Sequence, residues 1–298
     1  MTDKEWEPCF IINAHAGLGF GKWILERLKK ECKKEKIRFR IYHTHKPGEE
    51  TELTKKAIDA NYSPIIAVGG DGTVSKVGLA LAGTKVPLGI IPAGTGNGLA
   101  IEMGMPIDAI LAYRALKKAG EIDIDIGIVN NRTFINIFGI GLDAVIVSEF
   151  SKFKGIERNF FQYVAETLKQ FSQSEGFEAN VSGISFPENR KHISIMLVNN
   201  RRLGGAAVIA PWASLYDGFL DLISIPKLAF HEGIQEMVRL ITSTLNKSNS
   251  LLNFSVKEGV IITEKPLRYQ IDGETMPDKK NEFIFDVKKR CLRILRCK

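Results

Sequence analysis

Cysteine is scarce in this sequence of 298 residues, and the few cysteines are not grouped. The four are Cys9, Cys32, Cys291 and Cys297. None forms the C-x-x-C spacing of a zinc or redox site, and so few cysteines do not make a disulfide framework. We therefore expect free thiols with a mainly structural role.

Long apolar runs, low-complexity linkers and internal repeats are also absent. A membrane-spanning helix needs roughly 18 or more apolar residues, and no run approaches that length. The charged start MTDKEWEP does not have the pattern of a signal peptide. These absences predict a cytoplasmic protein without a membrane-spanning helix.

Acidic residues are in deficit, because 41 Lys and Arg stand against 34 Asp and Glu, a net charge of +7. Such an excess favours an anionic partner, namely a membrane surface, a nucleic acid or a phosphorylated ligand. No basic module rich in aromatic residues is present, so we do not expect nucleic acid to be the partner. The oligomeric state cannot be read from these features.

Two glycine-rich turns dominate the N-terminal half. Residues 65–68 and 88–91 are continuous apolar runs, which predicts strands inside a sheet covered by helices on both faces. The turn GGDGT (69–73) follows the first run directly, and the turn GTGNG (94–98) follows the second after Pro92 and Ala93. Ligands of such sheets bind outside the carboxyl ends of the strands. Both turns are therefore expected to face one ligand crevice.

The composition of these turns suits a phosphate group. Glycine lets a ligand approach the backbone, and a helix start presents N–H groups to an anion. Thr73 and Thr95 add hydroxyls, and Asp71 adds one carboxylate. This set predicts a nucleotide phosphate with a metal ion. The alternative is that the turns are only tight connections between strand and helix. One such turn alone would fit that interpretation, but two adjacent turns favour a ligand site.

Two common nucleotide-binding motifs are excluded. The loop after residues 9–13 resembles a Walker A loop, but Ala16 replaces its first glycine and Trp23 its Ser or Thr. In the second turn Gly94 and Gly96 match the first two glycines of a Rossmann fingerprint, but Leu99 stands where its third Gly or Ala belongs. Neither a P-loop NTPase nor a dinucleotide oxidoreductase is supported.

Strands and helices alternate up to about residue 119, which predicts an open parallel sheet. Thr44, at the end of the strand over residues 38–44, is a candidate nucleotide contact. His43 and His45 alternate along this strand, which argues against joint metal ligation.

Period-two patterning replaces this alternation from residue 122 and predicts an antiparallel second domain. We expect one or two strands over residues 132–147, and strands near 177–186 and 192–198. Two amphipathic helices are expected, with apolar faces formed by Phe161, Val164, Leu168 and Phe171, and by Ile234, Met237, Val238, Ile241 and Leu245. Asp217-Gly218 is a hairpin turn first and a Mg²⁺ site second.

Five segments in this order, residues 13–17, 69–73, 92–97, 204–217 and 272–274, resemble the lipid kinases related to diacylglycerol kinase. The family includes the small soluble bacterial members and is related to sphingosine kinases. The GGDGT turn alone is less specific, because NAD kinases share it and phosphofructokinases carry a relative of it. The later loop and the Asp272-Gly273-Glu274 turn select the lipid kinases.

The resemblance implies a fold and a domain division. It implies an NAD kinase/diacylglycerol kinase-like α/β domain, with helices on both faces of an open parallel sheet, and a C-terminal antiparallel β-sandwich. The nucleotide-binding domain would cover residues 1–123 and be completed by residues 283–298, which return to it. The lipid-acceptor domain would cover residues 124–282.

The resemblance also implies roles for individual residues. ATP would be bound by Asn13, Thr44, Gly69, Gly70, Asp71, Gly72, Thr73 and Thr95. Asp71 would organise the catalytic Mg²⁺ and the phosphates. Glu274 would be the general base on the lipid hydroxyl, with Asp272 as the alternative. A structural Mg²⁺ would be bound by Asp217 and the backbone carbonyls of Ser214 and Phe219.

Two positions depart from the family pattern. Ala14 stands where relatives commonly have Pro, and Gly98 where they have Asp. Neither position supplies an essential chemical group, so the departures bear on the subfamily more than on activity.

The sequence therefore predicts an ATP- and Mg²⁺-dependent lipid kinase that associates transiently with a membrane surface. Diacylglycerol, phosphatidylglycerol, monoacylglycerol, sphingosine and ceramide remain open as acceptors. An NAD kinase with a soluble acceptor, or a non-catalytic membrane- or nucleotide-binding module, are the alternatives. Asp143 would face a polar headgroup or belong to a structural turn.

Overall fold

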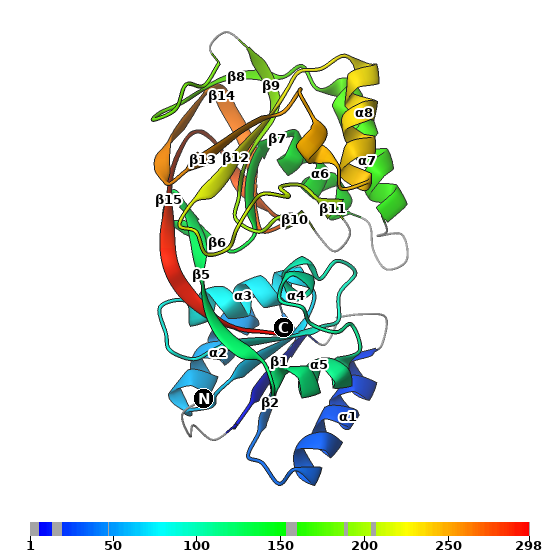
Figure 1. Cartoon of the computed structure of the whole chain (residues 1–298), viewed down its shortest axis with the longest axis vertical. Helices are drawn as coiled ribbons and strands as arrows, with labels where there is room; N and C mark the ends of the chain where they lie inside the picture. Colours follow the sequence, from blue (N-terminus) through cyan, green and yellow to red (C-terminus); the bar gives the residue numbers. More distant parts are fainter. Residues whose placement is uncertain are drawn as a thin grey trace. The chain divides into compact units, whose positions relative to one another are not determined.

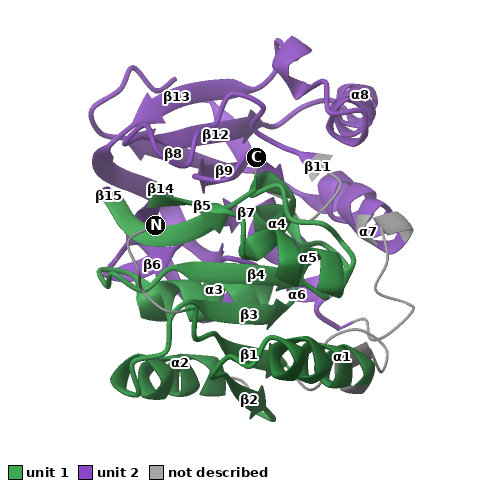
Figure 2. Cartoon of the chain, turned by 60° about the horizontal axis from the view of Figure 1, so that its bottom comes forward, with its two compact units in different colours: residues 1–124, 290–298 green, residues 125–289 purple. Residues whose placement is uncertain are grey.

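The computed structural model describes residues 6–13, 20–46, 48–152, 160–187, 190–203 and 207–297. Residues 14–19 and 204–206, on which parts of two expected motifs fall, lie outside the described residues, as does the side chain of Phe161. The chain divides into two compact units, residues 1–124 with 290–298 and residues 125–289 (Figure 2). Two strands, β5 (Gly120–Val129) and β15 (Glu274–Arg296), run from one unit into the other.

The first unit contains a parallel sheet in the order β15, β4, β3, β1, β2. Its elements are β1 (Cys9–Asn13), α1 (Phe20–Lys34), β2 (Arg40–Thr44), α2 (Glu49–Asp59), β3 (Ile65–Gly69), α3 (Asp71–Leu81), β4 (Leu88–Pro92), α4 (Gly98–Glu102) and α5 (Ala109–Leu116). The C-terminal segment joins this sheet in parallel beside β4, where Ile294 is opposite Leu88.

Both faces of this sheet are covered by helices. α2 packs against α3, and α1 packs against α5. Figure 1 shows these pairs on opposite faces of the sheet. All residues of β3 and β4 are buried, as continuous apolar strands between two helical layers must be. Ile24, Leu28 and Cys32 form the buried stripe of α1.

The second unit is mainly antiparallel and carries three α-helices in its described part. Its elements are β6 (Arg132–Phe134), β7 (Ile137–Gly141), α6 (Leu142–Phe150), α7 (Phe160–Gln173), β8 (Phe177–Val181), β9 (Lys191–Val198), β10 (Arg202–Leu203), β11 (Ala207–Val208), β12 (Leu220–Pro226), α8 (Phe230–Ile241), a 3₁₀ turn (Leu245–Lys247), β13 (Leu252–Val256) and β14 (Glu258–Ile271). The strand order is β13, β12, β9, β7, β14, β15.

Strand β8 closes part of this sheet on itself, because it pairs with both β9 and β14. One face of the strands encloses an aromatic core that includes Phe138, Tyr269 and Phe283. The other face carries two smaller apolar clusters on which α6 and α8 pack. The predicted fold class, a parallel α/β domain followed by a β-sandwich domain, is confirmed.

Three sequence-based expectations about elements were wrong. Residues 142–147 are helical, because Gly141 takes a positive φ of 77° and ends the strand. β8 ends at Val181 and does not reach residue 186. α8 ends at Ile241, so Leu245 lies on the following 3₁₀ turn and not on the face of that helix.

Within the part of the chain that the structure describes, every helix is too short or too polar to cross a bilayer.

Candidate functional site

One candidate site, in the first unit, lies where the winding of the parallel sheet reverses. β1 pairs with β2 on one side and with β3 on the other. The chain passes from β1 to β2 through α1 and then returns across β1 to β3 through α2. In doubly wound sheets the ligand crevice opens at such a point, outside the carboxyl ends of the strands. Asn13 ends β1 there, and Gly69 ends β3.

The two glycine turns pack directly against each other. A Cβ atom on Gly94 would lie 2.4 Å from the Cα of Gly70, closer than real Cβ contacts allow. A Cβ on Gly69 would lie 2.7 Å from the Cβ of Thr73. The close approach of the two backbones therefore requires glycine at position 94, and the Thr73 side chain leaves no room for a Cβ at position 69.

Asp71 connects the turns. It is the first residue of α3, where a carboxylate is favoured by the helix dipole, and its Oδ2 accepts a 2.9 Å hydrogen bond from the Asn97 amide. Asn97 also closes its own turn, with Oδ1 accepting from the Gly94 amide and Nδ2 donating to the Gly94 carbonyl. Asn97 was not among the predicted site residues. The signal in the sequence is an asparagine inside a glycine-rich turn. Asparagine tolerates a positive φ, and Asn97 has a φ of 65°.

The threonines of the predicted nucleotide site differ in exposure. Thr73 and Thr44 are buried, and Thr44 is paired with Asn13 at the ends of β2 and β1. The Thr73 Oγ1 accepts a 3.3 Å hydrogen bond from the Asn13 side-chain amide. Thr95 and Gly72 are exposed. Thr73 and Thr44 are therefore buried and closed to a ligand, whereas Thr95 and Gly72 are accessible to one.

A second candidate site, in the second unit, is the Asp272-Gly273-Glu274 turn, which joins β14 to β15. Ile271 pairs with Glu274, so Asp272 and Gly273 form a two-residue hairpin loop. Their φ angles are 47° and 82°, the positive values that a type I′ turn needs. Glu274 is exposed at the start of β15, and Asp272 is half-buried.

Asp272 is fixed by backbone amides. Its carboxylate accepts hydrogen bonds from the N–H groups of Ile135, Asn136 and Ile137 at 2.8–3.0 Å. Its own N–H donates to the Ile137 carbonyl at 2.9 Å. The Asp272 side chain therefore anchors the turn to the segment before β7.

A chain of hydrogen bonds runs from this turn to Asp143. The Gly273 amide donates to Gln270 Oε1 at 2.8 Å, and Gln270 Nε2 donates to Asp143 Oδ2 at 2.6 Å. Gln270 is fully buried, and a Cβ on Gly139 would lie 1.8 Å from Asp143 Oδ2. Burial raises the pKa of the Asp143 carboxyl to about 6, although the Gln270 hydrogen bond opposes this shift.

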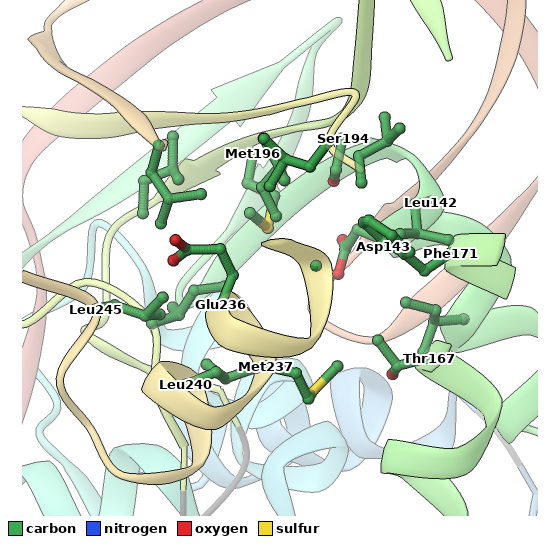
Figure 3. A pocket seen from close by; sticks show the side chains of 18 residues that line it. Leu142, Asp143, Thr167, Phe171, Ser194, Met196, Glu236, Met237, Leu240 and Leu245 are labelled. Atoms are coloured by element: carbon green, nitrogen blue, oxygen red, sulfur yellow. The ribbon is translucent and has the colours of Figure 1, made fainter. Parts of the chain in front are cut away.

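Asp143 also lines an apolar cavity of about 100 Å³ inside the second unit. Its walls come from α6, α7, α8 and the strand face opposite the aromatic core, and they include Leu142, Phe171, Met196 and Met237 (Figure 3). The polar groups among these walls include Asp143 and Glu236. Sequence reasoning named Asp143 but missed Glu236, because a glutamate on an amphipathic helix is normally assigned to the solvent face.

The predicted metal residues lie in the turn before β12. Asp217 Oδ1 accepts from the Phe219 amide at 3.0 Å, and Ser214 Oγ accepts from the Tyr216 amide at 3.4 Å. Burial, and then the negative charge of Asp217, raise the pKa of Asp221 to about 6. Asp221 was not predicted from the sequence. Two carboxylates that repel each other suit a nearby cation, so this donor set fits Mg²⁺.

Among the described residues no group of three or more His, Cys, Asp or Glu side chains is arranged to hold a metal. A Mg²⁺ ion at either predicted position would therefore depend on one or two carboxylates with backbone carbonyls, water or substrate phosphates as further ligands. Mg²⁺ is commonly bound in this way.

Two family models match the chain. Residues 7–129 match the diacylglycerol kinase catalytic domain, and residues 136–296 match the YegS C-terminal NAD kinase beta sandwich-like domain. The second match alone covers more than half of the chain.

Individual relatives are similar at modest identity. An uncharacterized protein of Synechocystis sp. is 28% identical over 281 residues, which cover 89% of this chain and 64% of that protein. A Pseudomonas aeruginosa protein named "Probable lipid kinase YegS-like" is 27% identical over 246 residues, 80% of this chain and 79% of that protein. A crystal structure of a diacylglycerol kinase from Bacillus anthracis has a similar fold, with a TM-score of 0.74 at 21% identity, and the likeness covers 98% of this chain and 97% of that one.

Proposed function

Because the chain belongs to the diacylglycerol kinase-like family of lipid kinases, we propose that it transfers the γ-phosphoryl group of ATP to the hydroxyl of a membrane lipid. One observation carries this proposal. The hydrogen bonds through Gln270 and Asp143 connect the acidic turn at Asp272 directly to an apolar cavity.

The paired glycine turns of the first unit support ATP as the donor. Thr95, Gly72 and the first turn of α3 would contact its phosphates, and Asn97 would keep the turns in register through Asp71. A single carboxylate suffices when substrate phosphates supply most of the ligands of Mg²⁺, so Asp71 would hold the catalytic ion. When bound, Mg²⁺ would neutralise charge that develops on the phosphates.

Glu274 is the better candidate for the general base. The carboxylate of Asp272 already accepts three backbone hydrogen bonds, which favour its charged form and weaken it as a base. In the proposed step a bond forms between the lipid oxygen and the γ-phosphorus, and the bond from that phosphorus to the bridging oxygen of ADP breaks. The hydroxyl proton passes to the Glu274 carboxylate, and ADP leaves.

The cavity of the second unit would hold apolar chain of the acceptor lipid. Lipid-binding cavities are lined mainly by apolar side chains with a few polar groups, as this one is. The Asp143 end would lie toward the reacting hydroxyl, since Gln270 ties Asp143 to the turn that carries Glu274. Gln270 would then be a positioning residue.

The outer face of α8 supports contact with a membrane surface. Four large apolar side chains are 41–55% exposed along this helix, namely Phe230, Ile234, Val238 and Ile241. Their spacing of three or four residues places them on one stripe, which we call the α8 stripe. The adjacent face of α8 lines the cavity through Gly233, Met237 and Leu240. A helix that is apolar on both faces suits a boundary between a lipid pocket and a bilayer.

Assay of the purified protein with radiolabelled ATP tests the proposal. We expect labelled lipid when mixed micelles of diacylglycerol, phosphatidylglycerol, monoacylglycerol or sphingoid lipids are supplied. Labelled NADP from NAD, with no labelled lipid, would instead identify an NAD kinase. Absence of any labelled product across the lipid panel and NAD would favour a non-catalytic binding module.

A further inference from the structure

Glu236 is buried in the wall of the cavity, and one of its two carboxylate oxygens has no hydrogen-bond partner among the described residues. The residue is 8% exposed, and its Oε1 accepts a hydrogen bond from the Arg239 guanidinium one turn along α8. Its Oε2 is buried and finds no hydrogen-bond donor among the residues that the structure describes. A carboxylate oxygen removed from water without a donor costs stability, so a group from outside the protein is expected to supply one.

Close packing of α8 against α7 keeps the Glu236 side of the helix at the cavity. Gly233, one turn before it, is in close contact with the Phe171 ring, since a Cβ at this position would lie 2.2 Å from that ring. This contact holds α8 against α7 and keeps the Glu236 face inward. Figure 3 shows Glu236 on the Leu245 side of the cavity and Asp143 on the Leu142 side.

Asp143 and Glu236 are the two acidic residues of a mainly apolar cavity, whose wall also contains Thr167 and Ser194. Asp143 is linked to the turn that carries Glu274, whereas the ion pair of Glu236 is formed within α8. Under the proposed function, Asp143 lies toward the phosphorylated hydroxyl. Glu236 is then available to a different part of the same lipid.

We propose that Glu236 determines acceptor specificity by accepting a hydrogen bond from a second donor group of the lipid, a hydroxyl or an ammonium, distinct from the hydroxyl that is phosphorylated. This inference rests on the proposed function. It favours monoacylglycerol-type or amino-alcohol lipids over diacylglycerol, whose only hydroxyl is the phosphorylated one. Site groups that hydrogen-bond a substrate discriminate strongly against analogues that lack the donor, because the buried acceptor is then left unpaired.

Three single-chain lipids test the proposal. 1-O-hexadecylglycerol carries a second hydroxyl, its 2-O-methyl ether carries none, and 2-aminooctadecan-1-ol carries an ammonium instead. For the wild-type protein we expect KM for the methyl ether to exceed that for the better donor-bearing lipid by about tenfold or more. A preference for the diol identifies a hydroxyl as the donor, and a preference for the amino alcohol identifies an ammonium.

Two variants of Glu236 and one control complete the experiment. The quantity compared is the ratio of KM for the methyl ether to KM for the better donor-bearing lipid. Glu236→Leu removes the acceptor and should bring this ratio close to one. Glu236→Gln retains an acceptor oxygen and should keep most of the ratio. Glu166→Leu on α7 is the control. Glu166 is equally buried and pairs with Gln170 and Lys169, but it does not line the cavity, so its loss should leave the ratio unchanged.

Equilibrium binding of the same lipids without ATP separates this inference from the proposed function. Selective binding of the donor-bearing lipids by a wild-type protein that phosphorylates nothing would contradict the proposed function, and loss of this selectivity in Glu236→Leu would still support the role of Glu236. Equal KM and equal binding for the three lipids, unchanged in Glu236→Leu, would overturn the inference. That result would mean that Glu236 is satisfied by buried water alone.

Discussion

At the scale of single residues, the two carboxylates of the acidic turn have different surroundings. Asp272 is held by three backbone amides, and Glu274 is exposed two positions further on. We expect Glu274→Gln to lower kcat by about 10²–10⁴-fold with little change in Tm, because a general base contributes about that much.

We expect Asp272→Asn to lower the free energy of unfolding by about 1–3 kcal/mol, because the variant loses an acceptor for the three backbone amides.

Steady-state kinetics and thermal unfolding of both variants check these predictions. Wild-type turnover in Glu274→Gln would contradict the assignment of the base. A wild-type Tm in Asp272→Asn would contradict the anchoring role of Asp272.

His192 is a second residue with a measurable consequence. It is fully buried, its Nδ1 lies 2.6 Å from Ser224 Oγ, and its ring stacks near Phe186. Burial lowers the pKa of the imidazole from 6.5 to about 4. The unfolded chain then binds a proton that the folded protein does not between these pH values. Stability from this residue is full above pH 6.5 and is lost as the pH falls toward 4.

The size of this loss is about 3 kcal/mol, from the pKa shift of His192. Urea unfolding from neutral pH down to about pH 4 measures it. His192→Gln should remove this share of the pH dependence, while His231→Gln, at an exposed position of α8, should not. The raised pKa values of Asp143 and Asp221 change the free energy of unfolding with pH in the opposite direction to His192. These two contributions are the same in the variant and the wild type, so they cancel in the comparison. Parallel pH profiles for the His192→Gln and wild-type proteins would refute the prediction.

Asp217 predicts a response to magnesium that does not depend on catalysis. Burial, and then the charge of Asp217, raise the pKa of Asp221, and a cation there would relieve the repulsion between the two carboxylates. Millimolar Mg²⁺ should therefore raise Tm relative to EDTA, because a ligand that binds only the folded state stabilises it. We expect Asp217→Asn to lose this increase and Asp286→Asn, at an exposed position of β15, to keep it. An identical Tm increase in Asp217→Asn would exclude this site.

At the scale of elements, α8 separates two kinds of apolar surface. Its inner face lines the cavity and its outer face is the α8 stripe. Replacing Ile234, Val238 and Ile241 by Asn should weaken binding to phosphatidylglycerol vesicles by about tenfold or more, because insertion of these side chains is lost. Activity toward a short-chain lipid dissolved as monomers should persist.

Vesicle cosedimentation measures this effect. Ile262→Asn with Ile284→Asn is the matched control, because these side chains are equally exposed but lie on β14 and β15. Equal vesicle affinity in the α8 variant and in this control would show that the stripe is not the membrane contact.

The same helix shows the limit of reasoning from periodicity. The apolar positions 234, 237, 238 and 241 were predicted correctly as part of an amphipathic pattern. The pattern does not say which face is inside, and here Gly233 and Glu236 are buried while Ile234 and Val238 are exposed. The close packing of Gly233 on Phe171 decides the orientation of the helix.

At the scale of the whole molecule, the net charge of +7 predicts salt-sensitive membrane binding. Each Lys or Arg near an anionic surface adds about 1 kcal/mol, and salt screens this attraction within a Debye length of about 8–10 Å. Raising the salt concentration should lower the affinity for anionic vesicles in the wild type and in the α8 variant alike. Neutral vesicles should show little salt dependence. Salt-independent binding to anionic vesicles would contradict this electrostatic contribution.

The sequence alone determined the fold class and the positions at which we propose that chemistry occurs. Continuous apolar runs before glycine turns predicted the parallel sheet, and period-two patterning predicted the antiparallel unit. The glycines at positions 69, 70 and 94 and the Asp272-Gly273 hairpin are visible in the sequence because backbone conformation and close approach restrict these positions to few residue types.

Tertiary structure alone decided how these parts are connected. The contact of Asp71 with Asn97, the three amides on Asp272 and the Gln270 bridge to Asp143 join residues that are 26 to 137 positions apart. The inward orientation of Glu236 likewise depends on α7 packing against α8. Local propensity and periodicity describe single elements, whereas these contacts exist only once the sheets and helices have packed together.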